Sequence, residues 1–324
     1  MGEAIETKDL ARFKQAHDHF QKVVNQEVVG YDEVVTDLMI GLLAVGHVLL
    51  EGVPGTAKTT LAKTFSKTLG MSFKRIQFTQ DLMPMDIVGH FMYDQTTKKF
   101  ELRKGPVFTN FLLADEINRA PPKTQSAMLE TMEERQVTIE GKTLPMTKPF
   151  IVVATMNPID SEGVYRLPEA QKDRFMIRTK MGYVGAEQEE LMLKIKLANA
   201  DFDTGAKRLN VATVLEGQEL TYKVKMGDET VRYLQRLAAK TREHPDVNVG
   251  ASPRSMTQML RASQAYALIS GRRNVHPDDV AYITPKVLCH RIILRVDAEA
   301  KGKTAEDVVR EVINAVPKPT VVKK

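Results

Sequence analysis

The sequence predicts an α/β fold in two parts: a parallel β-sheet sandwich into which two β-hairpins are inserted, followed by a smaller, all-α domain. Up to about Tyr183, short apolar runs alternate with amphipathic helical patterns, which is typical of a parallel sheet covered by helices on both faces. Two pairs of short runs joined by polar turns interrupt this alternation and indicate the hairpins. Beyond Tyr183 only helical patterns follow.

The first half of the chain is expected to supply the sheet and the helices that cover it. Apolar residues recur at helical spacing from Leu10 to Val24, which predicts an amphipathic helix, and a second helix is expected at Tyr31–Leu43. A glycine-rich turn and a helix at Thr59–Leu69 come directly after the first expected strand. The expected buried strands are His47–Leu50, Phe73–Phe78, Thr109–Ala114, Phe150–Thr155 and Phe175–Thr179.

Turn residues and caps predict the hairpins and the C-terminal helices. Ile87–Tyr93 pairs with Lys99–Lys104 around a polar DQTT turn, and Gln136–Glu140 pairs with Thr143–Thr147 around Gly-Lys. The expected C-terminal helices are Glu187–Ala198, Asp228–Arg242, Pro253–Ser270, Pro277–Leu288 and Thr304–Val316. Asp201–Lys225 is expected to hold a linker or a small irregular unit. The predicted boundaries are residues 1–25 for the N-terminal helix, 26–183 for the α/β domain, 184–227 for a connecting region and 228–324 for the helical domain.

Composition is that of a globular protein in a reducing compartment. Of the 324 residues, 43% are hydrophobic and 27% are charged. No apolar run approaches the roughly 18 residues that a membrane helix needs, and the N-terminus lacks the pattern of a secretory signal. The single cysteine, Cys289, excludes an internal disulfide and the common zinc sites built from several cysteines. We therefore expect a cytoplasmic protein without a membrane span.

The positive net charge does not by itself indicate a nucleic-acid-binding protein. The net charge is +5 and the pI is about 9.0, but the basic residues are scattered, and Lys318, Lys323 and Lys324 in the C-terminal tail supply three of them. There is no tryptophan, and the aromatic residues are not interleaved with basic ones as in a base-stacking surface. A solvated surface of mixed charge is the favoured interpretation, so nucleic acid is not an expected partner.

The segment Glu51–Thr60, EGVPGTAKTT, nearly matches the phosphate-binding loop G-x-x-x-x-G-K-[ST] and departs from it only at Ala57. It lies between an expected strand and an expected helix, where backbone N–H groups and the positive end of the helix can hold phosphates. The expected nucleotide-binding residues in this loop are Gly52, Val53, Pro54, Gly55, Thr56, Ala57, Lys58, Thr59 and Thr60. The alternative is an ordinary structural turn rich in glycine and proline.

Each distinctive residue of the loop has an expected task. Gly52 and Gly55 would give the backbone the freedom to approach a phosphate closely. Lys58 would reach the β- and γ-phosphates, and the Thr59 hydroxyl would bind Mg²⁺. Ala57 lies at the start of the helix, where we expect a small side chain with an ordinary negative φ to fit.

Polar residues at the ends of two further strands complete a candidate catalytic site. Asp115 and Glu116 follow the apolar run FLLA, and Asn157 follows VVATM. Ligands bind at the carboxyl ends of the strands in open α/β sheets, so Asp115 is expected to hold the Mg²⁺ and Glu116 to orient and deprotonate a water. Asn157 could hydrogen-bond the γ-phosphate or that water. In isolation, the acidic pair could instead cap a helix, and Asn157 could belong to an Asn-Pro turn.

Five segments together resemble the MoxR family of AAA+ ATPases: EGVPGTAKT, LLADEINRAPPKTQSAMLETMEERQV, VATMNP, LPEAQKDRF and REHPDVNVGASPRS. They occur in the order of that family between about Val23 and Pro317. The resemblance implies an AAA+ nucleotide-binding domain and a helical lid domain, with the hairpins as the helix-2 insert and the pre-sensor insert. It also accounts for Ala57, because alanine is common at that position in the family.

The resemblance assigns roles that the residue patterns alone do not. Arg174 matches the arginine finger that enters the site of a neighbouring subunit, and Arg254 matches sensor 2, which contacts the γ-phosphate of its own or a neighbouring subunit. Val28, Val29 and Gly30 match the segment that lines the adenine pocket. The resemblance further implies ATP and Mg²⁺ as cofactors and a homo-oligomeric ring, expected to be a hexamer. It implies protein clients, a von Willebrand factor A domain partner or a task in metal-cofactor insertion.

Two other functions are alternatives to a protein-remodelling ATPase. A nucleic-acid-dependent motor is favoured only by the basic residues of the first hairpin, which are Lys98, Lys99, Arg103 and Lys104. A nucleotide-dependent binding switch with negligible turnover is the other alternative. Because a switch could dispense with a catalytic acid and an arginine finger, Glu116 and Arg174 argue against it.

Overall fold

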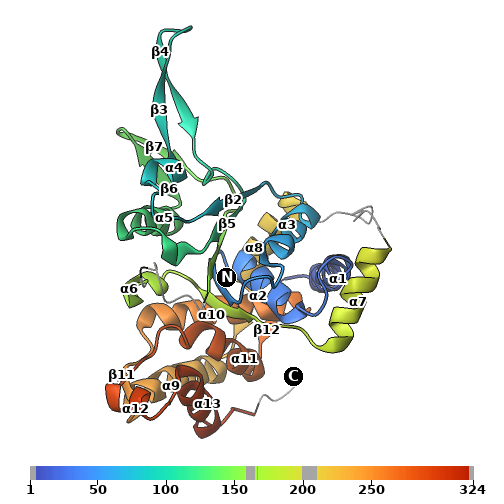
Figure 1. Cartoon of the computed structure of the whole chain (residues 1–324). Coiled ribbons are helices and arrows are strands. Elements are labelled where there is room, and N and C mark those ends of the chain that lie inside the picture. The colour runs from blue at the N-terminus through green and yellow to red at the C-terminus, as the bar shows by residue number, and fades with distance from the viewer. Residues whose placement is uncertain (1–4, 158–164, 166, 199–209, 321–324) are drawn as a thin grey trace. The chain divides into compact units, whose positions relative to one another are not determined.

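The computed structural model describes residues 5–157, 165, 167–198 and 210–320 (Figure 1). The chain divides into two compact units, which are described separately. The sheet unit comprises His19–Phe175 and Thr179–Leu215, and the helical unit comprises Met1–Asp18, Met176–Arg178 and Glu216–Lys324. Among the described residues, no helix is long and apolar enough to cross a membrane.

A five-stranded sheet forms the centre of the sheet unit, and its strands lie in the order β2-β5-β8-β1-β9. The strands are β1 (Val48–Gly52), β2 (Phe73–Gln77), β5 (Phe111–Asp115), β8 (Ile151–Met156) and β9 (Ile177–Met181). β1, β8, β5 and β2 pair in parallel. β5 is buried along its whole length and β8 along all but its last residue, because both are apolar and have neighbours on each side. The predicted parallel α/β sheet is confirmed.

Strand β2 differs from the prediction of a buried, continuously apolar strand at Phe73–Phe78. It is the edge strand of the sheet, and Lys74 and Arg75 are exposed. An edge strand has a partner on one side only and tolerates polar side chains, which explains the sequence FKRIQ. The polar residues of β2 are therefore free to face the end of β5.

The helices of the first 200 residues are α1 (Thr7–Val24), α2 (Asp32–Leu43), α3 (Lys58–Thr68), α4 (Pro84–Val88), α5 (Pro122–Glu134), α6 (Glu169–Lys172) and α7 (Ala186–Leu197). Of these, α1, α2, α3 and α7 begin and end close to the predicted positions, whereas α4, α5 and α6 were not predicted. Proline at the first position of α5 suits a helix start, because that N–H would have no partner inside the helix. Met128, Leu129 and Met132 of α5 are buried in one cluster with residues of β5 and β8. This packing fixes the strand ends from which Asp115 and Asn157 emerge.

Both predicted hairpins are confirmed as antiparallel pairs. The first joins β3 (Gly89–Asp94) to β4 (Lys99–Lys104), and the second joins β6 (Gln136–Ile139) to β7 (Lys142–Pro145). Phe91 and its cross-strand partner Leu102 pack against the core of the sheet unit. Further along the same face, Tyr93 pairs with Phe100, and both are exposed where the hairpin extends away from the sheet (Figure 1).

The helical unit confirms the predicted C-terminal helices and adds elements that the sequence did not indicate. Its helices are α8 (Val211–Lys223) from Glu216 onward, α9 (Asp228–Glu243), α10 (Pro253–Ile269), α11 (Pro277–Leu288), α12 (Val296–Ala300) and α13 (Ala305–Ala315). Short strands form two pairs, β10 (Lys225–Met226) with β12 (Asn274–Val275) and β11 (Val247–Val249) with β13 (Ile293–Leu294). The expectation of helices alone beyond Tyr183 was therefore incomplete.

Helix α8 corrects the prediction of a linker at Asp201–Lys225, of which residues 201–209 lie outside the described part. The side chain of Asn210 accepts a hydrogen bond from the backbone N–H of Thr213 at 2.9 Å and so caps the start of this helix. Gly217 within the helix weakens its propensity, which is why the sequence alone suggested an irregular segment. Tertiary packing that buries Val214 and Leu220 compensates.

Candidate nucleotide-binding site

The loop between β1 and α3 contains two glycines that serve different purposes. Gly55 has a φ of 84°, a conformation that favours glycine, and no atom would lie within 4 Å of an added Cβ. Gly52 instead lies against β9, where an added Cβ would be 2.6 Å from the carbonyl oxygen of Met181. Gly52 therefore meets a packing requirement between strands, and its close approach to a phosphate stays a prediction.

Ala57 does not have the negative φ that we expected. Its φ is 60° and its ψ is 25°, so it is in the left-handed region, directly before the first residue of α3. This conformation costs a residue with a Cβ roughly 1–2 kcal/mol, which explains why the loop motif places glycine there. Alanine has a small side chain, and here it adopts the strained backbone of the motif glycine.

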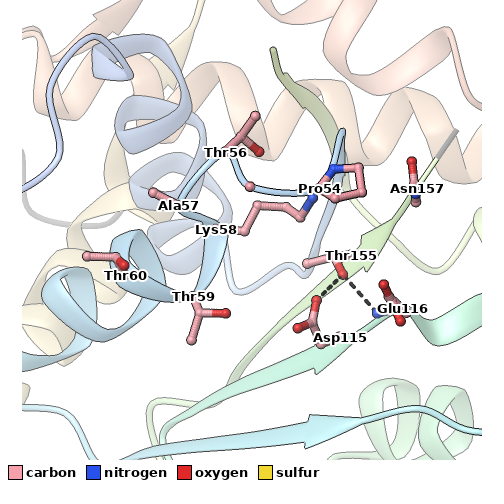
Figure 2. Close-up of a pocket in the computed structure, with 11 residues that line it drawn as sticks. Pro54, Thr56, Ala57, Lys58, Thr59, Thr60, Asp115, Glu116, Thr155 and Asn157 are labelled. Carbon is pink, nitrogen blue, oxygen red and sulfur yellow. Dashed lines mark hydrogen bonds between the residues drawn. The ribbon is translucent and has the colours of Figure 1, made fainter. Parts of the chain in front are cut away.

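Lys58 folds back over the loop. Its Nζ donates hydrogen bonds to the carbonyl oxygens of Gly52, at 2.7 Å, and Val53, at 2.8 Å. The Thr56 hydroxyl donates to the same Val53 carbonyl at 2.9 Å. Figure 2 shows the lysine side chain extended along the loop. A positive charge therefore lies at the centre of the loop, held by carbonyl oxygens that a phosphate could replace.

The two acidic residues at the end of β5 are tied to Thr155 of β8. The Thr155 hydroxyl donates to Asp115 Oδ1 at 2.5 Å and accepts the backbone N–H of Glu116 at 2.8 Å (Figure 2). Glu116 has a φ of 55°, and such strain in a residue other than glycine costs of order 1–3 kcal/mol and is often found at functional sites. Sequence reasoning missed Thr155, although a polar residue near the end of an apolar strand is a detectable signal.

Strand β2 adds two further residues that sequence reasoning missed. Arg75 donates to Asp115 Oδ2 from Nε at 3.0 Å and from Nη2 at 2.6 Å. Gln77 donates from Nε2 to Glu116 Oε2 at 2.7 Å, and Arg119 Nε lies 3.0 Å from the same oxygen. Both carboxylates therefore face positively charged or hydrogen-bond-donating side chains. Arg75 and Gln77 do not stand out in the sequence, because Phe73–Phe78 is predicted to be a buried strand.

A pocket of about 380 Å³ brings the loop and the strand ends together (Figure 2). Its lining is Pro54, Gly55, Thr56, Ala57, Lys58, Thr59, Thr60, Asp115, Glu116, Thr155 and Asn157. Lys58 and Thr59 come from the start of α3, Asp115 and Glu116 from the end of β5, and Asn157 from the end of β8. Lysine, hydroxyl, carboxylate and amide groups thus face one cavity, a combination suited to a polyphosphate and a hard cation.

A smaller and more apolar pocket of about 120 Å³ shares Gly55, Thr56 and Ala57 with the first. Its other lining residues are Glu27, Val28, Val29, Tyr31, Tyr183, Val184, Glu189 and Met192. Burial, assisted by the negative charge of Glu189, raises the pKa of Tyr31, whose hydroxyl donates to the Gly182 carbonyl at 2.9 Å. The neutral tyrosine and the two valines form a surface on which an aromatic base could lie.

Gly30, the third residue expected at the adenine pocket, is beside the lining rather than in it. Its φ is 86°, and an added Cβ would lie 2.8 Å from a methyl carbon of Val184. The absence of a side chain therefore lets Val184 approach and complete the smaller pocket.

The two arginines predicted from the family resemblance belong to different units, which are described separately. Arg174 follows α6, and its Nε is 2.9 Å from Glu133 Oε2 in the last turn of α5. Arg254 belongs to the helical unit, where it is the second residue of α10. The Ser252 side chain caps that helix by accepting the Ser255 N–H at 3.1 Å. Within the sheet unit, Arg174 is not among the lining residues of either pocket.

The oxygen ligands in the larger pocket fit a magnesium ion that is shared with a nucleotide. Within the described residues, no group of three or more His, Cys, Asp or Glu side chains could hold a metal ion by itself. Thr59 and Asp115 both line the pocket and offer a hydroxyl and a carboxylate oxygen. Mg²⁺ is commonly held by one or two protein groups together with phosphate and water oxygens, and this pair of side chains matches that mode.

Comparisons with known proteins cover both units. A family model for the ATPase family associated with various cellular activities (AAA) matches residues 47–177, and a model for the AAA lid domain matches residues 239–312. Chaperone MoxR1 of Mycobacterium tuberculosis is 43% identical over 309 residues, 92% of this chain and 81% of that protein. Protein MoxR of Methylorubrum extorquens is 28% identical over 336 residues, 96% of this chain and 97% of that protein. A crystal structure of a Cytophaga hutchinsonii protein assigned as an ATPase matches with a TM-score of 0.89 at 37% identity, over 97% of this chain and 98% of that chain.

Proposed function

The chain belongs to the MoxR family of AAA+ ATPases, and we propose that it hydrolyses MgATP as one subunit of a ring-shaped motor that remodels other proteins. One observation carries the proposal: Lys58, Thr59, Asp115, Glu116 and Asn157 line a single pocket of about 380 Å³. A structural turn would have no need of these groups around one cavity.

ATP would occupy both pockets of the sheet unit. The base would lie against Val28 and Val29, and the phosphates along the loop N–H groups at the start of α3. Lys58 would exchange the carbonyl oxygens of Gly52 and Val53 for the β- and γ-phosphates. Thr59 would hold the Mg²⁺, which neutralises charge on these phosphates when it is bound.

Glu116 is the group best placed to act as the general base. Water attacks the γ-phosphorus, the bond from that phosphorus to the β–γ bridging oxygen breaks, and the proton of the water passes to the carboxylate. ADP and phosphate then leave. Asn157, buried at the rim of the same pocket, would orient the water or the γ-phosphate through its amide.

We propose a ring because of where Arg174 lies. It pairs with Glu133 and is absent from the lining of both pockets of the sheet unit. A guanidinium in that position can stabilise a transition state only in another subunit, where water is excluded. We propose a hexamer, with Arg254 of the helical unit as a second arginine that contacts the γ-phosphate.

Protein clients are the substrate class that we favour. The first hairpin and the helix before it expose Met83, Met85, Met92, Tyr93 and Phe100, a surface suited to apolar peptide segments. The name of the relative Chaperone MoxR1 is consistent with this class. From the family resemblance, we extend the proposal to a von Willebrand factor A domain partner and to metal-cofactor insertion as the task. The cytoplasm is the proposed location because the chain has a single cysteine.

The test measures ATP turnover per chain as a function of protein concentration, with the variants Glu116→Gln and Arg174→Ala. Turnover should rise steeply with concentration, and each variant alone should lose about 10³-fold or more. Mixing the two inactive variants should restore turnover, because each Arg174→Ala chain keeps its Glu116 and receives an arginine from its Glu116→Gln neighbour. Turnover that is independent of concentration and of Arg174 would contradict the shared site. Nucleotide binding with negligible turnover in the wild type would instead favour the binding switch.

A further inference from the structure

We propose that Arg75 is a placeholder for the magnesium ion: it neutralises Asp115 and must be displaced before Mg²⁺ can use that carboxylate. The inference rests on the proposed function, since it assumes that Asp115 serves a nucleotide-bound Mg²⁺. Arg75 would then set how strongly Mg²⁺ is coupled to nucleotide binding.

Each oxygen of the Asp115 carboxylate accepts a hydrogen bond from another side chain. Oδ2 accepts two N–H groups of the Arg75 guanidinium, at 2.6 and 3.0 Å, and Oδ1 accepts the Thr155 hydroxyl at 2.5 Å. The Asp115 side chain is only 11% exposed. A carboxylate in such surroundings needs a positive partner, because an uncompensated buried charge is costly.

Arg75 is suited to leave when another cation arrives. Its side chain is 44% exposed, and it projects from the edge strand of the sheet rather than from a buried strand. A displaced guanidinium can therefore return to water at little cost. Thr155, by contrast, is fully buried and would keep its hydrogen bond to Oδ1.

Competition for one oxygen has a measurable consequence. If Mg²⁺ must replace the guanidinium at Asp115, part of its binding free energy is spent in breaking the ion pair, and Mg²⁺ strengthens nucleotide binding by less than it otherwise would. Removal of the guanidinium should therefore increase the effect of Mg²⁺ on nucleotide affinity. A purely structural ion pair would leave that effect unchanged.

The experiment measures ADP affinity by isothermal titration calorimetry on the full chain, once with excess Mg²⁺ and once with EDTA. The dissociation constant with EDTA is divided by the dissociation constant with Mg²⁺, and this ratio is compared between wild type and Arg75→Gln. We expect this ratio to increase about 3- to 10-fold, the size that a partly exposed charge-assisted pair would give. Lys74→Gln is the matched control: it removes the same charge from the adjacent residue, which is exposed and points to the opposite face of β2, and its ratio should equal that of wild type.

The remaining outcomes are decisive as well. An unchanged or smaller ratio in Arg75→Gln overturns the inference while leaving the proposed function intact. Failure of the wild type to bind ADP under both conditions contradicts the proposed function, and the inference with it. Should Arg75→Gln fold poorly by circular dichroism, Arg75→Lys provides the same test, because a point charge without the paired N–H groups should give a ratio between those of wild type and full removal. A ratio in Arg75→Lys equal to that of wild type or below it would overturn the inference.

Discussion

Two aspartate–arginine pairs, one in each unit, show how similar contacts can serve different ends. In the helical unit, Arg272 donates to both oxygens of Asp279, at 2.6 and 2.7 Å, and the Asp279 side chain is 3% exposed. The same carboxylate also accepts the backbone N–H of His276 at 2.8 Å, at the start of α11. Both carboxylate oxygens are therefore occupied by groups of the helical unit, and the pair stabilises the start of α11.

The Asp115–Arg75 pair has a comparable shortest distance but an open arrangement. Arg75 uses only Oδ2 of the carboxylate, the guanidinium is half-exposed, and a pocket of about 380 Å³ lies beside Asp115. The comparison teaches that two ion pairs of equal shortest distance can differ in how easily the arginine can be displaced. Arg272 contacts both oxygens of its carboxylate and is 28% exposed, whereas Arg75 contacts one oxygen and is 44% exposed.

The largest expected difference appears when each arginine is truncated. Arg272→Met leaves a buried carboxylate without its charged partner and should cost about 3–5 kcal/mol of unfolding free energy. Arg75→Met removes a half-exposed partner from a carboxylate that keeps the Thr155 hydrogen bond, and it should cost less, about 1–2 kcal/mol. Urea unfolding followed by circular dichroism measures both. Equal losses in the two variants would show that the two pairs do not differ as we describe.

The next expected effect is on ATP turnover, where substitution of Asp115 should matter more than substitution of Asp279. Asp115→Asn removes the carboxylate that would serve Mg²⁺ and should lower ATP turnover by about 100-fold or more, while most of the stability remains. Asp279→Asn should lower the stability but leave turnover per folded chain within about threefold of wild type, because it touches neither pocket. Steady-state ATPase assays normalised to the folded fraction separate the two. A comparable fall in both variants would place Asp279 in the functional machinery.

The sequence indicated some members of the candidate site and not others for a physical reason. Asp115 and Glu116 follow an apolar strand directly, so chain order alone places them at its carboxyl end. Arg75 and Gln77 reach these carboxylates only because β2 pairs with β5, with Gln77 opposite Asp115. That pairing joins segments about 40 residues apart, and local periodicity carries no information on it. The left-handed conformation of Ala57 was likewise hidden, since residue identity favoured an ordinary φ.

A third buried polar side chain, His47, extends the comparison because it is neutral and forms hydrogen bonds in place of an ion pair. His47 donates from Nε2 to the Met132 carbonyl at 3.0 Å and accepts the Val152 N–H at Nδ1, at 2.9 Å. Burial, with the positive charge of Arg135, lowers the pKa of His47 to about 3. The two hydrogen bonds hold a neutral ring between α5 and β8.

The depressed pKa of His47 predicts an acid-side loss of stability. The unfolded chain takes up a proton on this histidine below pH 6.5, whereas the folded chain does so only near pH 3, so the contribution is complete above pH 6.5 and falls as the pH is lowered. From pH 7.5 to pH 5.5 the unfolding free energy should fall by about 1.4 kcal/mol from this group. In His47→Gln that part of the pH dependence should vanish, although the variant is less stable throughout. An identical pH slope in the variant and the wild type would assign the dependence to other groups.

The smallest expected effect concerns strain at the rim of the open site. Ala57 adopts a φ of 60° in the loop beside the Asp115–Arg75 pair, whereas Ala127 lies in the regular interior of α5 in the same unit. Ala57→Gly should raise the unfolding free energy by about 0.5–1 kcal/mol, because the relief of left-handed strain exceeds the added entropy of the unfolded glycine. Ala127→Gly should lower it by about 1 kcal/mol, because glycine weakens a helix interior. Urea unfolding without nucleotide measures both changes in unfolding free energy, which should have opposite signs. Destabilisation by both substitutions would mean that the backbone at Ala57 is not strained. The difference between the two units would then be supported only by the two ion pairs.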